Sequence, residues 1–454
     1  MNKLLITFYG DDFTGSTDAL EQLALAGIRT ALFIEPPTAS QLKRFPKLQA
    51  IGVAGMTRSM SPQAMECKLR PALKKLKALG APHVHYKVCS TFDSSPKIGS
   101  VGRAIDVAAE IFGAPFVPLL VAAPALGRFT VFGTHFARYG IGSSGTIHRL
   151  DRLPCVSKHP ITPMLEADLR RHLEKQTKKV IGLFDILKLT LPIKEAKLAL
   201  NQIVDDGADV VLFDALYAEH MHRIGELIDD HASAKKPLFS VGSSGIEMAL
   251  GALWRNRTLA GDNGKSLNLK AQNLRLVTPS PTKQLLVASG SCSPVTEGQI
   301  KWALKQGFAE VELDATALVS EGWSGREFRR ATDAVGRILK AGRSVIAHTG
   351  QRRTVRGSTT AKYFGSALGK VVRGALAETN VRRVCITGGD TSSYAARALG
   401  IEALEMIALL TPGAPLCKAH APDSPADGRE VVFKGGQVGA EDYFGVVKNG
   451  DGTE

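Results

Sequence analysis

The sequence predicts an α/β protein of two doubly wound, mainly parallel-sheet domains with a cleft between them. Short apolar runs alternate with helical stretches of roughly 10 to 20 residues, the pattern of strands joined by crossover helices. Several runs end in Gly- or Ser-rich turns, as strands do at the ligand-binding edge of an open α/β sheet. A chain of 454 residues is also too long for one ordinary core, so two domains are expected.

The expected strands of the first domain are short apolar runs separated by helical patterns. They cover residues 4–9, 30–34, 50–54, 83–88, 118–122, 180–183, 210–214 and 237–241. The alternation breaks at residues 259–283, which contain a Gly-Asp-Asn-Gly cluster and then Pro-Ser-Pro. We therefore predict domains at residues 1–260 and 283–454, joined by a linker at 261–282.

The second domain repeats the same strand logic. Its expected strands cover residues 284–288, 310–313, 344–347, 383–387 and 405–409, again with helical patterns between them. Residues 132–163 fit neither pattern, because Gly, His, Arg and Pro are mixed there without periodicity. A long irregular segment in a compact domain is usually functional, so we expect a binding loop.

Composition limits the class of protein. The hydrophobic fraction of 44% and charged fraction of 22% are those of a globular chain. We expect a cytoplasmic protein without membrane contact, because no signal peptide and no apolar run of spanning length is found. Six widely spaced cysteines form no Cys-x-x-Cys pair, which argues against structural zinc and a disulfide framework.

The formal net charge of +14 suggests an anionic partner. The basic residues are scattered in pairs with little aromatic interleaving, so a small anionic ligand is favoured over nucleic acid. A basic anion- or nucleic-acid-binding protein stays as the alternative from another class. The sequence leaves a homodimer open as the assembly.

The segment Gly10-Asp-Asp-Phe-Thr-Gly-Ser-Thr-Asp18 is the first candidate site. It follows an apolar run and precedes a helical pattern, so hydroxyls, carboxylates and helix N–H groups meet at one strand end. Adjacent Asp11 and Asp12 repel each other unless a cation, a donor-rich ligand or a helix N-terminus offsets them. The alternative is an ordinary N-cap and turn, although capping needs only one of the two.

A second candidate is the strand end Lys87-Val-Cys-Ser-Thr-Phe-Asp-Ser-Ser95. An ammonium group, hydroxyls and the Asp93 carboxylate there would suit a hydroxyl- and carboxylate-bearing substrate. Arg58, just past another strand, offers a bidentate clamp for a substrate carboxylate. A Ser/Thr-rich turn without a ligand is the alternative.

Gly/Ser turns at 289–293 and 387–393, with the Gly-rich residues 434–439, could form one nucleotide site, since small residues let backbone N–H groups approach a phosphate. A turn at 241–245 has the same form in the first domain. Two further segments match nucleotide-binding motifs in part but lack a feature that those motifs require. Gly140–Gly145 has dinucleotide spacing without a buried strand before it, and Gly264-Lys-Ser266 lacks the first glycine of a P-loop.

Seven segments in order resemble the four-carbon acid sugar kinase family, over nearly the whole chain. They are Asp11-Asp-Phe-Thr-Gly-Ser16, Thr57-Arg-Ser59, Lys87-Val-Cys-Ser-Thr-Phe-Asp-Ser94, His159-Pro-Ile-Thr-Pro-Met164, Gly290-Ser-Cys-Ser-Pro-Val-Thr296, Gly388-Gly-Asp-Thr-Ser392 and Lys434-Gly-Gly-Gln-Val-Gly439. The resemblance implies an ATP-dependent kinase with an N-terminal sugar-acid domain and a C-terminal nucleotide domain.

The resemblance also implies which residues meet each ligand. Facing the acid sugar would be Asp11, Asp12, Arg58, Lys87, Ser90, Thr91 and Asp93. Facing ATP would be Ser289, Ser291, Gly388, Gly389, Asp390, Thr391, Gly435 and Gly436. Phosphoryl transfer with Mg²⁺ then makes Asp12 the base or hydroxyl orienter and Asp11 a Mg²⁺ or substrate partner, and the two roles are exchangeable on sequence alone. The other metal ligands are not assigned.

The chain departs from the family pattern mainly in the substrate half. The family usually has Asn-Gly-Arg-Thr where this chain reads Leu126-Gly-Arg-Phe-Thr130, and residues 97–101 and 132–139 are also unusual. ATP use is therefore better supported than the identity of the acid, and a relative with another hydroxy acid as substrate is an alternative. An NAD-dependent oxidoreductase rests only on residues 140–145.

Overall fold

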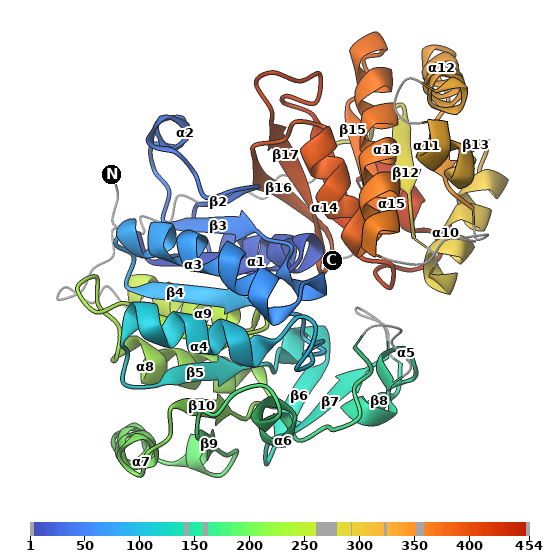
Figure 1. Ribbon diagram of the computed structural model, residues 1–454. Helices are drawn as coiled ribbons and strands as arrows, with labels where there is room; N and C mark the ends of the chain where they lie inside the picture. The colour runs from blue at the N-terminus through green and yellow to red at the C-terminus, as the bar shows by residue number, and fades with distance from the viewer. Residues whose placement is uncertain are drawn as a thin grey trace.

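One long mixed sheet runs through the molecule. The computed structural model describes residues 4–139, 145–157, 162–259, 279–291, 293–321, 325–350 and 358–450. In these ranges a sheet of 15 strands has the order β13-β14-β12-β15-β18-β17-β16-β2-β3-β1-β4-β11-β5-β10-β9. We call residues 4–259 the N-terminal half and residues 279–450 the C-terminal half, and Figure 1 shows the two side by side.

Every strand of the N-terminal half in this sheet lies parallel to its neighbours within that half. These strands are β1 (Ile6–Gly10), β2 (Thr30–Phe33), β3 (Ala50–Ala54), β4 (His83–Lys87), β5 (Val117–Leu120), β9 (Ile181–Phe184), β10 (Val210–Phe213) and β11 (Leu238–Gly242). The expected strands match them within a residue or two. Most of these strands are buried throughout, as a sheet covered on both faces requires.

Helices cover the faces of this part of the sheet. They are α1 (Phe13–Leu25), α2 (Ala39–Lys43), α3 (Pro62–Ala78), α4 (Val101–Phe112), α6 (Leu169–Glu174), α7 (Ile193–Asp205), α8 (Ala218–Asp229) and α9 (Gly245–Leu259). Parallel strands with helical crossovers bring all strand carboxyl ends to one edge. The candidate residues that follow β1, β3 and β4 therefore lie together.

The C-terminal half has a parallel part and an antiparallel extension. The strands are β12 (Leu285–Ser289), β13 (Ala309–Glu312), β14 (Val345–His348), β15 (Arg383–Thr387), β16 (Ala403–Thr411), β17 (Ala414–His420) and β18 (Glu430–Lys434). The helices are α10 (Pro294–Lys305), α11 (Ala315–Glu321), α12 (Arg326–Lys340), α13 (Ser358–Glu378), α14 (Gly389–Ala398) and α15 (Tyr443–Asn449).

The strand expected at 405–409 is present within β16, but it is not one more parallel crossover strand, and β17 and β18 were not predicted. β16 pairs antiparallel with β17, and β17 pairs antiparallel with β18. The hairpin turns at Gly413, whose φ of 81° favours glycine. No helix separates β16 from β17, so the three-strand extension escaped a pattern that relied on alternating strands and helices.

The two halves share the sheet and a core. β2 pairs antiparallel with β16, through Phe33 opposite Ala403 and Leu32 opposite Leu404. From α14, Arg397 donates to the carbonyl oxygens of Ile34 and Ala54 at 3.2 and 3.1 Å. One cluster of buried apolar side chains includes members of both halves.

Residues 128–131, 134–138 and 147–149 form a second, antiparallel sheet of three strands, in the region where we expected a binding loop at 132–163. Its strands are β6 (Arg128–Val131), β7 (Thr134–Arg138) and β8 (Ile147–Arg149), followed by α5 (Pro154–Ser157). The β6–β7 turn is held by fully buried Asp214, which accepts the backbone N–H groups of Phe132 and Gly133 at 2.6 and 3.0 Å. The sequence pattern did not predict this hairpin because its composition is irregular, although the side chains of β7 alternate between half-buried and buried.

Some predictions concern residues outside the described ranges. Residues 140–144 of the Gly140–Gly145 motif, Gly264–Ser266 and most of the expected linker lie outside the described residues. In the described ranges, Cys67, Cys89, Cys385 and Cys417 are free thiols. No helix in those ranges is long and apolar enough to cross a membrane.

Candidate active site

The candidate residues of the N-terminal half meet at one edge because their strands are in register. Gly10 at the end of β1 lies opposite Ala54 of β3 and Lys87 of β4. Asp11 continues this edge, since its N–H donates to the carbonyl oxygen of Lys87 at 2.8 Å and its own carbonyl oxygen accepts from Arg58 at 3.1 Å. The segments that carry Asp11, Arg58 and Lys87 are thus joined through their backbones.

Asp12 is the N-cap of α1. Its Oδ1 accepts the N–H of Gly15 at 2.7 Å, and its Oδ2 accepts the hydroxyl of Thr14 at 3.0 Å and Arg58 Nη1 at 2.8 Å. The capping interpretation therefore holds for Asp12. Its side chain nevertheless reaches the surface of the cavity described below.

Asp11 has a different environment. Arg58 donates to its two carboxylate oxygens through Nε and Nη2, at 3.0 and 2.9 Å. Asp11 is 3% exposed and does not line the cavity. Burial raises the pKa of Asp11 to about 6, against the opposing attraction of Arg58. One guanidinium thus holds both carboxylates of the pair, which explains how adjacent aspartates are tolerated.

Lys87 and Asp18 form a second buried ion pair beside the first. Lys87 Nζ lies 3.2 Å from Asp18 Oδ2 and donates to the carbonyl oxygen of Val88 at 3.0 Å. Burial alone would lower the pKa of Lys87, but Asp18 and Glu247 outweigh it and the pKa lies above its ordinary value. Asp18 Oδ1 is buried and accepts no hydrogen bond in the described part of the chain.

Gly15 lets these charged groups converge. A Cβ at Gly15 would lie 2.5 Å from Asp12 Oδ1, 3.4 Å from Lys87 Nζ and 3.7 Å from Arg58 Nη2. Any side chain there would collide with the Asp12 carboxylate. The glycine therefore leaves space for a small group to reach a carboxylate, an ammonium and a guanidinium at once.

The loop after β4 supplies polar groups to the middle of the cavity. Ser90, Thr91 and Asp93 all line it, and the Thr91 hydroxyl donates to Asp93 Oδ1 at 3.0 Å. Cys89 also lines it, 2.9 Å from the Thr91 hydroxyl, and burial raises the pKa of its thiol to about 11. At neutral pH this thiol is protonated, so it is not an active nucleophile.

The three expected nucleotide loops come together in the C-terminal half. Ser289, Thr387 and Lys434 are register partners at the ends of adjacent β12, β15 and β18. Of the candidates, Gly389, Gly435 and Gly436 line the cavity, whereas Ser289, Ser291, Gly388 and Thr391 do not. The Ser289 hydroxyl accepts from Thr387 at 2.8 Å inside the core. Asp390 lies in α14, and its side chain is outside the description.

Small residues keep this loop cluster open. The N-cap of α14 is Gly388, with φ of 109° and no side-chain cap. Beneath the loops, buried Lys434 donates to the carbonyl oxygen of Gly435 at 3.0 Å, and burial lowers its pKa to about 8. The 241–245 turn is different, because Ser243 and Ser244 are fully buried and do not line the cavity. It packs the core.

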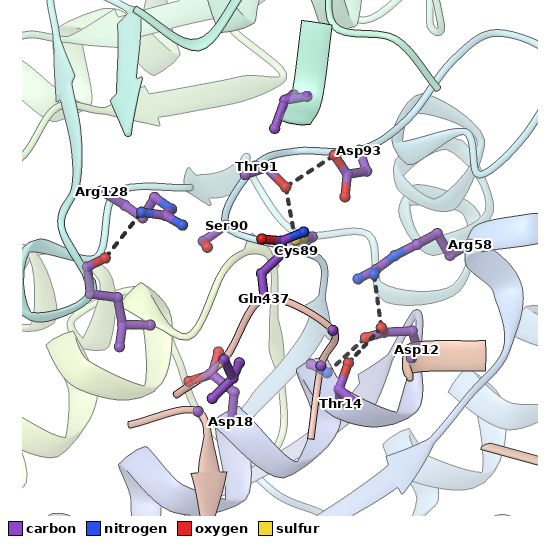
Figure 2. A pocket seen from close by; sticks show the side chains of 18 of the residues that line it. Asp12, Thr14, Asp18, Arg58, Cys89, Ser90, Thr91, Asp93, Arg128 and Gln437 are labelled. Atoms are coloured by element: carbon purple, nitrogen blue, oxygen red, sulfur yellow. Dashed lines mark hydrogen bonds and ion pairs between the residues drawn. The ribbon is translucent and has the colours of Figure 1, made fainter. Parts of the chain in front are cut away.

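The cavity has a volume of about 400 Å³ and is lined by both halves. Figure 2 shows Asp12, Thr14 and Arg58 on one side, Arg128 on the other, and Ser90, Cys89 and Gln437 between them. Where the halves meet, a Cβ at Gly389 would lie 3.7 Å from Asp12 Oδ2 and 3.8 Å from Thr14 Oγ1. The N-termini of α1 and α14 therefore face each other across a short gap.

Sequence reasoning missed several lining residues. They are Thr14, Gly15, Asp18, Cys89, Leu126, Arg128, Arg138, Tyr139, Leu153, Val156, Gly413, Gln437 and Val438. Thr14, Gly15, Asp18, Cys89, Gln437 and Val438 lie within the motifs of the sequence analysis, so motif membership could have found them. The basic and aromatic content of residues 132–163 was a signal for Arg138 and Tyr139, whereas nothing in the sequence marked Gly413.

The residues present fit a metal that arrives with a nucleotide. In the described ranges, no group of three or more His, Cys, Asp or Glu side chains could hold a metal ion. Mg²⁺ usually binds through one or two carboxylates together with substrate phosphates. Asp18, whose Oδ1 is buried at the cavity and accepts no hydrogen bond among the described residues, is a carboxylate of that kind.

Comparison with known proteins identifies the family to which this chain is similar. Residues 6–250 match a family model described as a sugar-binding N-terminal domain, and residues 286–444 match one described as a nucleotide-binding C-terminal domain. A 3-oxo-isoapionate kinase of Paraburkholderia graminis is 39% identical, with 98% of this chain and 94% of the relative aligned. A 3-oxo-tetronate kinase of Methylobacterium radiotolerans is 28% identical over 98% of each chain.

Solved structures agree on the fold. A crystal structure of a Salmonella typhimurium LT2 protein superposes with a TM-score of 0.76 at 24% identity, covering 97% of this chain and 98% of that one. A Haemophilus influenzae protein gives 0.67 at 23% identity, covering 97% and 99%. The curated relatives, rather than the fold, define the class of protein, which is a small-molecule kinase. The chain belongs to the four-carbon acid sugar kinase family.

Proposed function

We propose that the protein is an ATP-dependent kinase that phosphorylates a hydroxyl group of a 3-oxo acid sugar, of the 3-oxo-isoapionate or 3-oxo-tetronate type. Residues 1–260 bind the acid and residues 283–454 bind the nucleotide. The observation that carries the proposal is the position of Asp12. It caps α1 in the N-terminal half and lies beside the first residue of α14 in the C-terminal half, on a cavity lined by both.

The N-terminus of α14 suits a phosphate. Its first N–H groups have no side-chain cap, and its macrodipole places about half a positive charge there. Gly435 and Gly436, which also line the cavity, let backbone approach the phosphate chain. Of the remaining candidates, Ser289, Ser291, Gly388 and Thr391 shape these loops, and Asp390 belongs to the same first turn of α14.

The proposed transfer is a direct displacement. The substrate hydroxyl donates to Asp12, its oxygen bonds to the γ-phosphorus as the bond to the ADP oxygen breaks, and Asp12 takes the proton. Arg58 holds Asp12 and Asp11, so Asp11 acts through Arg58 rather than on the substrate. Lys87, Ser90, Thr91 and Asp93 bind the hydroxyl and carbonyl groups of the acid.

Mg²⁺ bound with the nucleotide would be held by Asp18, whose Oδ1 accepts no hydrogen bond among the described residues, and would neutralise charge on the phosphate oxygens. The short gap between the N-termini of α1 and α14 supports close contact between the two substrates. Binding both substrates in this gap would align the reacting oxygen with the phosphate.

The direct test is ADP release with Mg·ATP over a panel of acids. The panel contains threonate, erythronate, their 3-oxo forms and 3-oxo-isoapionate. Turnover of a 3-oxo acid, with several-fold lower kcat/KM for the reduced forms, is the expected result. Absence of turnover on every acid, from protein whose melting temperature ATP raises, would reject these substrates and leave a kinase for another hydroxy acid.

A further inference from the structure

We propose that Lys434 is a positioning residue for the nucleotide. Its buried ammonium group holds the Gly435–Gly436 loop with backbone N–H groups towards the cavity, and its charge stabilises the phosphate chain that binds there. Lys434 itself does not line the cavity, and the family resemblance pointed only to the two glycines that follow it. This inference rests on the proposed function, because it concerns how the same cavity binds ATP.

The Lys434 side chain lies behind the loop, inside the core. It is fully buried, and its Nζ donates to the carbonyl oxygen of Gly435 at 3.0 Å and to the Thr296 hydroxyl at 3.3 Å. The ring of Tyr443 lies 5.4 Å from the same nitrogen. All three partners are neutral, and Lys434 forms no ion pair with any described residue.

Side chains behind the loop hold its other carbonyl groups as well. The Thr296 hydroxyl donates to the carbonyl oxygen of Gly436 at 3.1 Å. Gln299 Nε2 donates to the carbonyl oxygens of residues 438–440 at 3.0, 3.1 and 2.9 Å. Because Thr296 also accepts from Lys434, the lysine is linked to two successive peptide groups of the loop.

These bonds determine which way the loop N–H groups point. In a trans peptide, the C=O and the following N–H point in opposite directions. The carbonyl groups of Gly435 and Gly436 point to the buried side chains, so the N–H groups of Gly436 and Gln437 point away from them, towards the cavity. Neither N–H donates to another described residue, and Figure 2 shows Gln437 in the middle of the cavity. Such N–H groups are suited to bind a phosphate.

The Lys434 charge acts at the same place. An ammonium group in a core of low polarity is poorly screened, so it raises the electrostatic potential at the loop. Burial lowers the pKa of Lys434 to about 8. A phosphate chain bound at the loop favours the charged form, so the pKa must rise when the nucleotide binds. Mg²⁺ held at Asp18 neutralises only part of the phosphate charge, since the Mg²⁺ complex of ATP is still an anion.

Among the described residues, Cys385 of β15 and Tyr443 of α15 are the titratable groups that face Lys434. Burial raises the pKa of the thiol to about 12 and holds the pKa of the phenol well above its ordinary value. Both groups are therefore neutral in the range where Lys434 titrates. From α10, the neutral side chains of Thr296 and Gln299 face the loop and Lys434.

Carboxylates of the adjoining helices α1, α10 and α14 are the same in wild type and in a Lys434 variant. They are Asp12, Asp18, Glu21, Glu297 and Asp390, the last with its side chain outside the described residues. Their contribution to proton binding is common to both proteins. The difference between wild type and variant therefore reports Lys434.

The test is the number of protons taken up when Mg·ATP binds at pH 9, measured by calorimetry in buffers of different ionisation enthalpy. Wild type should take up about 0.5 to 1 proton, because Lys434 is mostly neutral before binding and charged after it. The Kd for Mg·ATP should also rise up to about 10-fold for each pH unit above 8. Both measurements use wild type, so they test the inference even if a variant fails to fold.

Lys434→Met keeps the length of the side chain without its charge. It should raise the Kd for Mg·ATP at pH 7.5 at least about 10-fold, as expected for loss of an interaction with a charged group, and should remove the proton uptake. Lys434→Arg carries a charge that does not titrate at pH 9, so binding should recover in part without uptake. If Lys434 only packed the loop, wild type would take up no proton, and Lys434→Met would weaken binding equally at every pH.

The matched control is Lys448→Met in α15. Lys448 lies 5.6 Å from the ring of Phe308, a contact like that of Lys434 with Tyr443, but it is partly exposed and does not line the cavity. This variant removes one positive charge from the same half and should keep the wild-type Kd and proton uptake. Loss of the uptake in Lys448→Met would contradict the assignment to Lys434.

The same titration separates this inference from the kinase itself. Wild type that binds Mg·ATP at pH 9 without taking up a proton would reject the role of Lys434 and leave the kinase. Uptake that depends on Lys434, in protein that phosphorylates no acid of the panel, would keep that role and reject the substrates. Wild type that binds no nucleotide at any pH would reject both.

Discussion

At the scale of single residues, Asp12 combines two roles that can be separated. Its carboxylate caps α1 through Gly15 and also faces the cavity. Asp12→Ser keeps an oxygen able to cap the helix, whereas Asp12→Ala removes both functions. We expect each variant to lower kcat by about 10²- to 10⁴-fold, since a general base contributes that much.

The control for folding is the difference between these two variants. Asp12→Ala should lose about 1 kcal/mol more of the free energy of unfolding than Asp12→Ser, by the lost cap. Urea unfolding beside steady-state ADP release measures both quantities. If Asp12→Ser kept nearly wild-type activity and only the less stable Asp12→Ala lost activity, Asp12 would be only a helix cap.

The hydrogen bonds of buried His135 should make the stability of the protein depend on pH. Its ring nitrogens lie 2.9 Å from the Thr130 hydroxyl and 3.0 Å from the carbonyl oxygen of Ser90, so it ties the hairpin to the substrate loop. Burial and the nearby Arg128 charge lower the pKa of His135 to about 3. The folded state therefore favours the neutral ring, against an unfolded pKa of about 6.5.

The resulting stability is complete above pH 6.5 and is lost progressively as the pH falls towards 3. Each pH unit in this window costs about 1.4 kcal/mol. We expect urea unfolding of wild type to show that slope below pH 6, added to the slope of other groups. His135→Gln cannot titrate, so its stability should be lower at pH 7 but fall less steeply. Parallel curves for the two proteins would contradict the assignment.

Sequence reasoning at this scale could place residues but not orient them. The Gly10–Asp18 motif correctly located a polar strand end, since adjacent aspartates there need a cation, and Arg58 is that cation. It could not tell that Asp11 turns into the protein while Asp12 faces the cavity, because that depends on the backbone bond from Asp11 to Lys87.

At the scale of elements, Gly389 keeps the gap between the N-termini of α1 and α14 open. A methyl group there would lie 3.7 Å from Asp12 Oδ2, an ordinary contact that the fold tolerates, yet it would fill the gap between the two helix N-termini. We expect Gly389→Ala to keep wild-type stability and to lower kcat/KM for ATP at least about 10-fold, because a phosphoryl group must enter that gap.

Gly298 provides the matched substitution. It lies inside α10, and nothing lies within 4 Å of the place where its Cβ would be. Gly298→Ala should raise the free energy of unfolding by about 0.5 to 1 kcal/mol and leave the kinetics unchanged. Normal ATP kinetics in Gly389→Ala would exclude the gap as the site of transfer.

Elements with one clear periodicity could be predicted, and those defined by tertiary contacts could not. The strands of the N-terminal sheet were found because each is a buried apolar run between helices. The β6–β7 hairpin was not, because its turn is stabilised by Asp214, which lies far along the chain. Arg128 and Arg138 of this hairpin line the cavity, and such charged positions depart from the usual alternation of a strand.

At the scale of the whole molecule, the sequence predicted two domains and the structure joins them through one sheet. No local pattern marks the pairing of β2 with β16, because it depends on the antiparallel extension that carries β16. Pairing at this point brings the strand ends of both halves to the same cavity. The proposed function requires that geometry, since it places the two substrates in different halves.

The shared core implies that the two halves unfold together. Phe13 of the N-terminal half packs on Phe433 of the C-terminal half with ring centroids 4.6 Å apart, and both rings are buried. Glu21 of α1 also accepts the Gly413 N–H of the β16–β17 turn at 2.9 Å. Exposing either half would therefore uncover apolar and polar surface of the other.

We expect calorimetry to show a single unfolding transition, although chains of this length often show two. Saturating ATP should raise the temperature of that transition as a whole, because binding to the folded state stabilises every element that unfolds with it. Amide exchange should then slow in β5 and β11 of the N-terminal half as well as in β12 and β15. Two resolved transitions, of which ATP shifted only one, would mean that the shared core does not couple the halves.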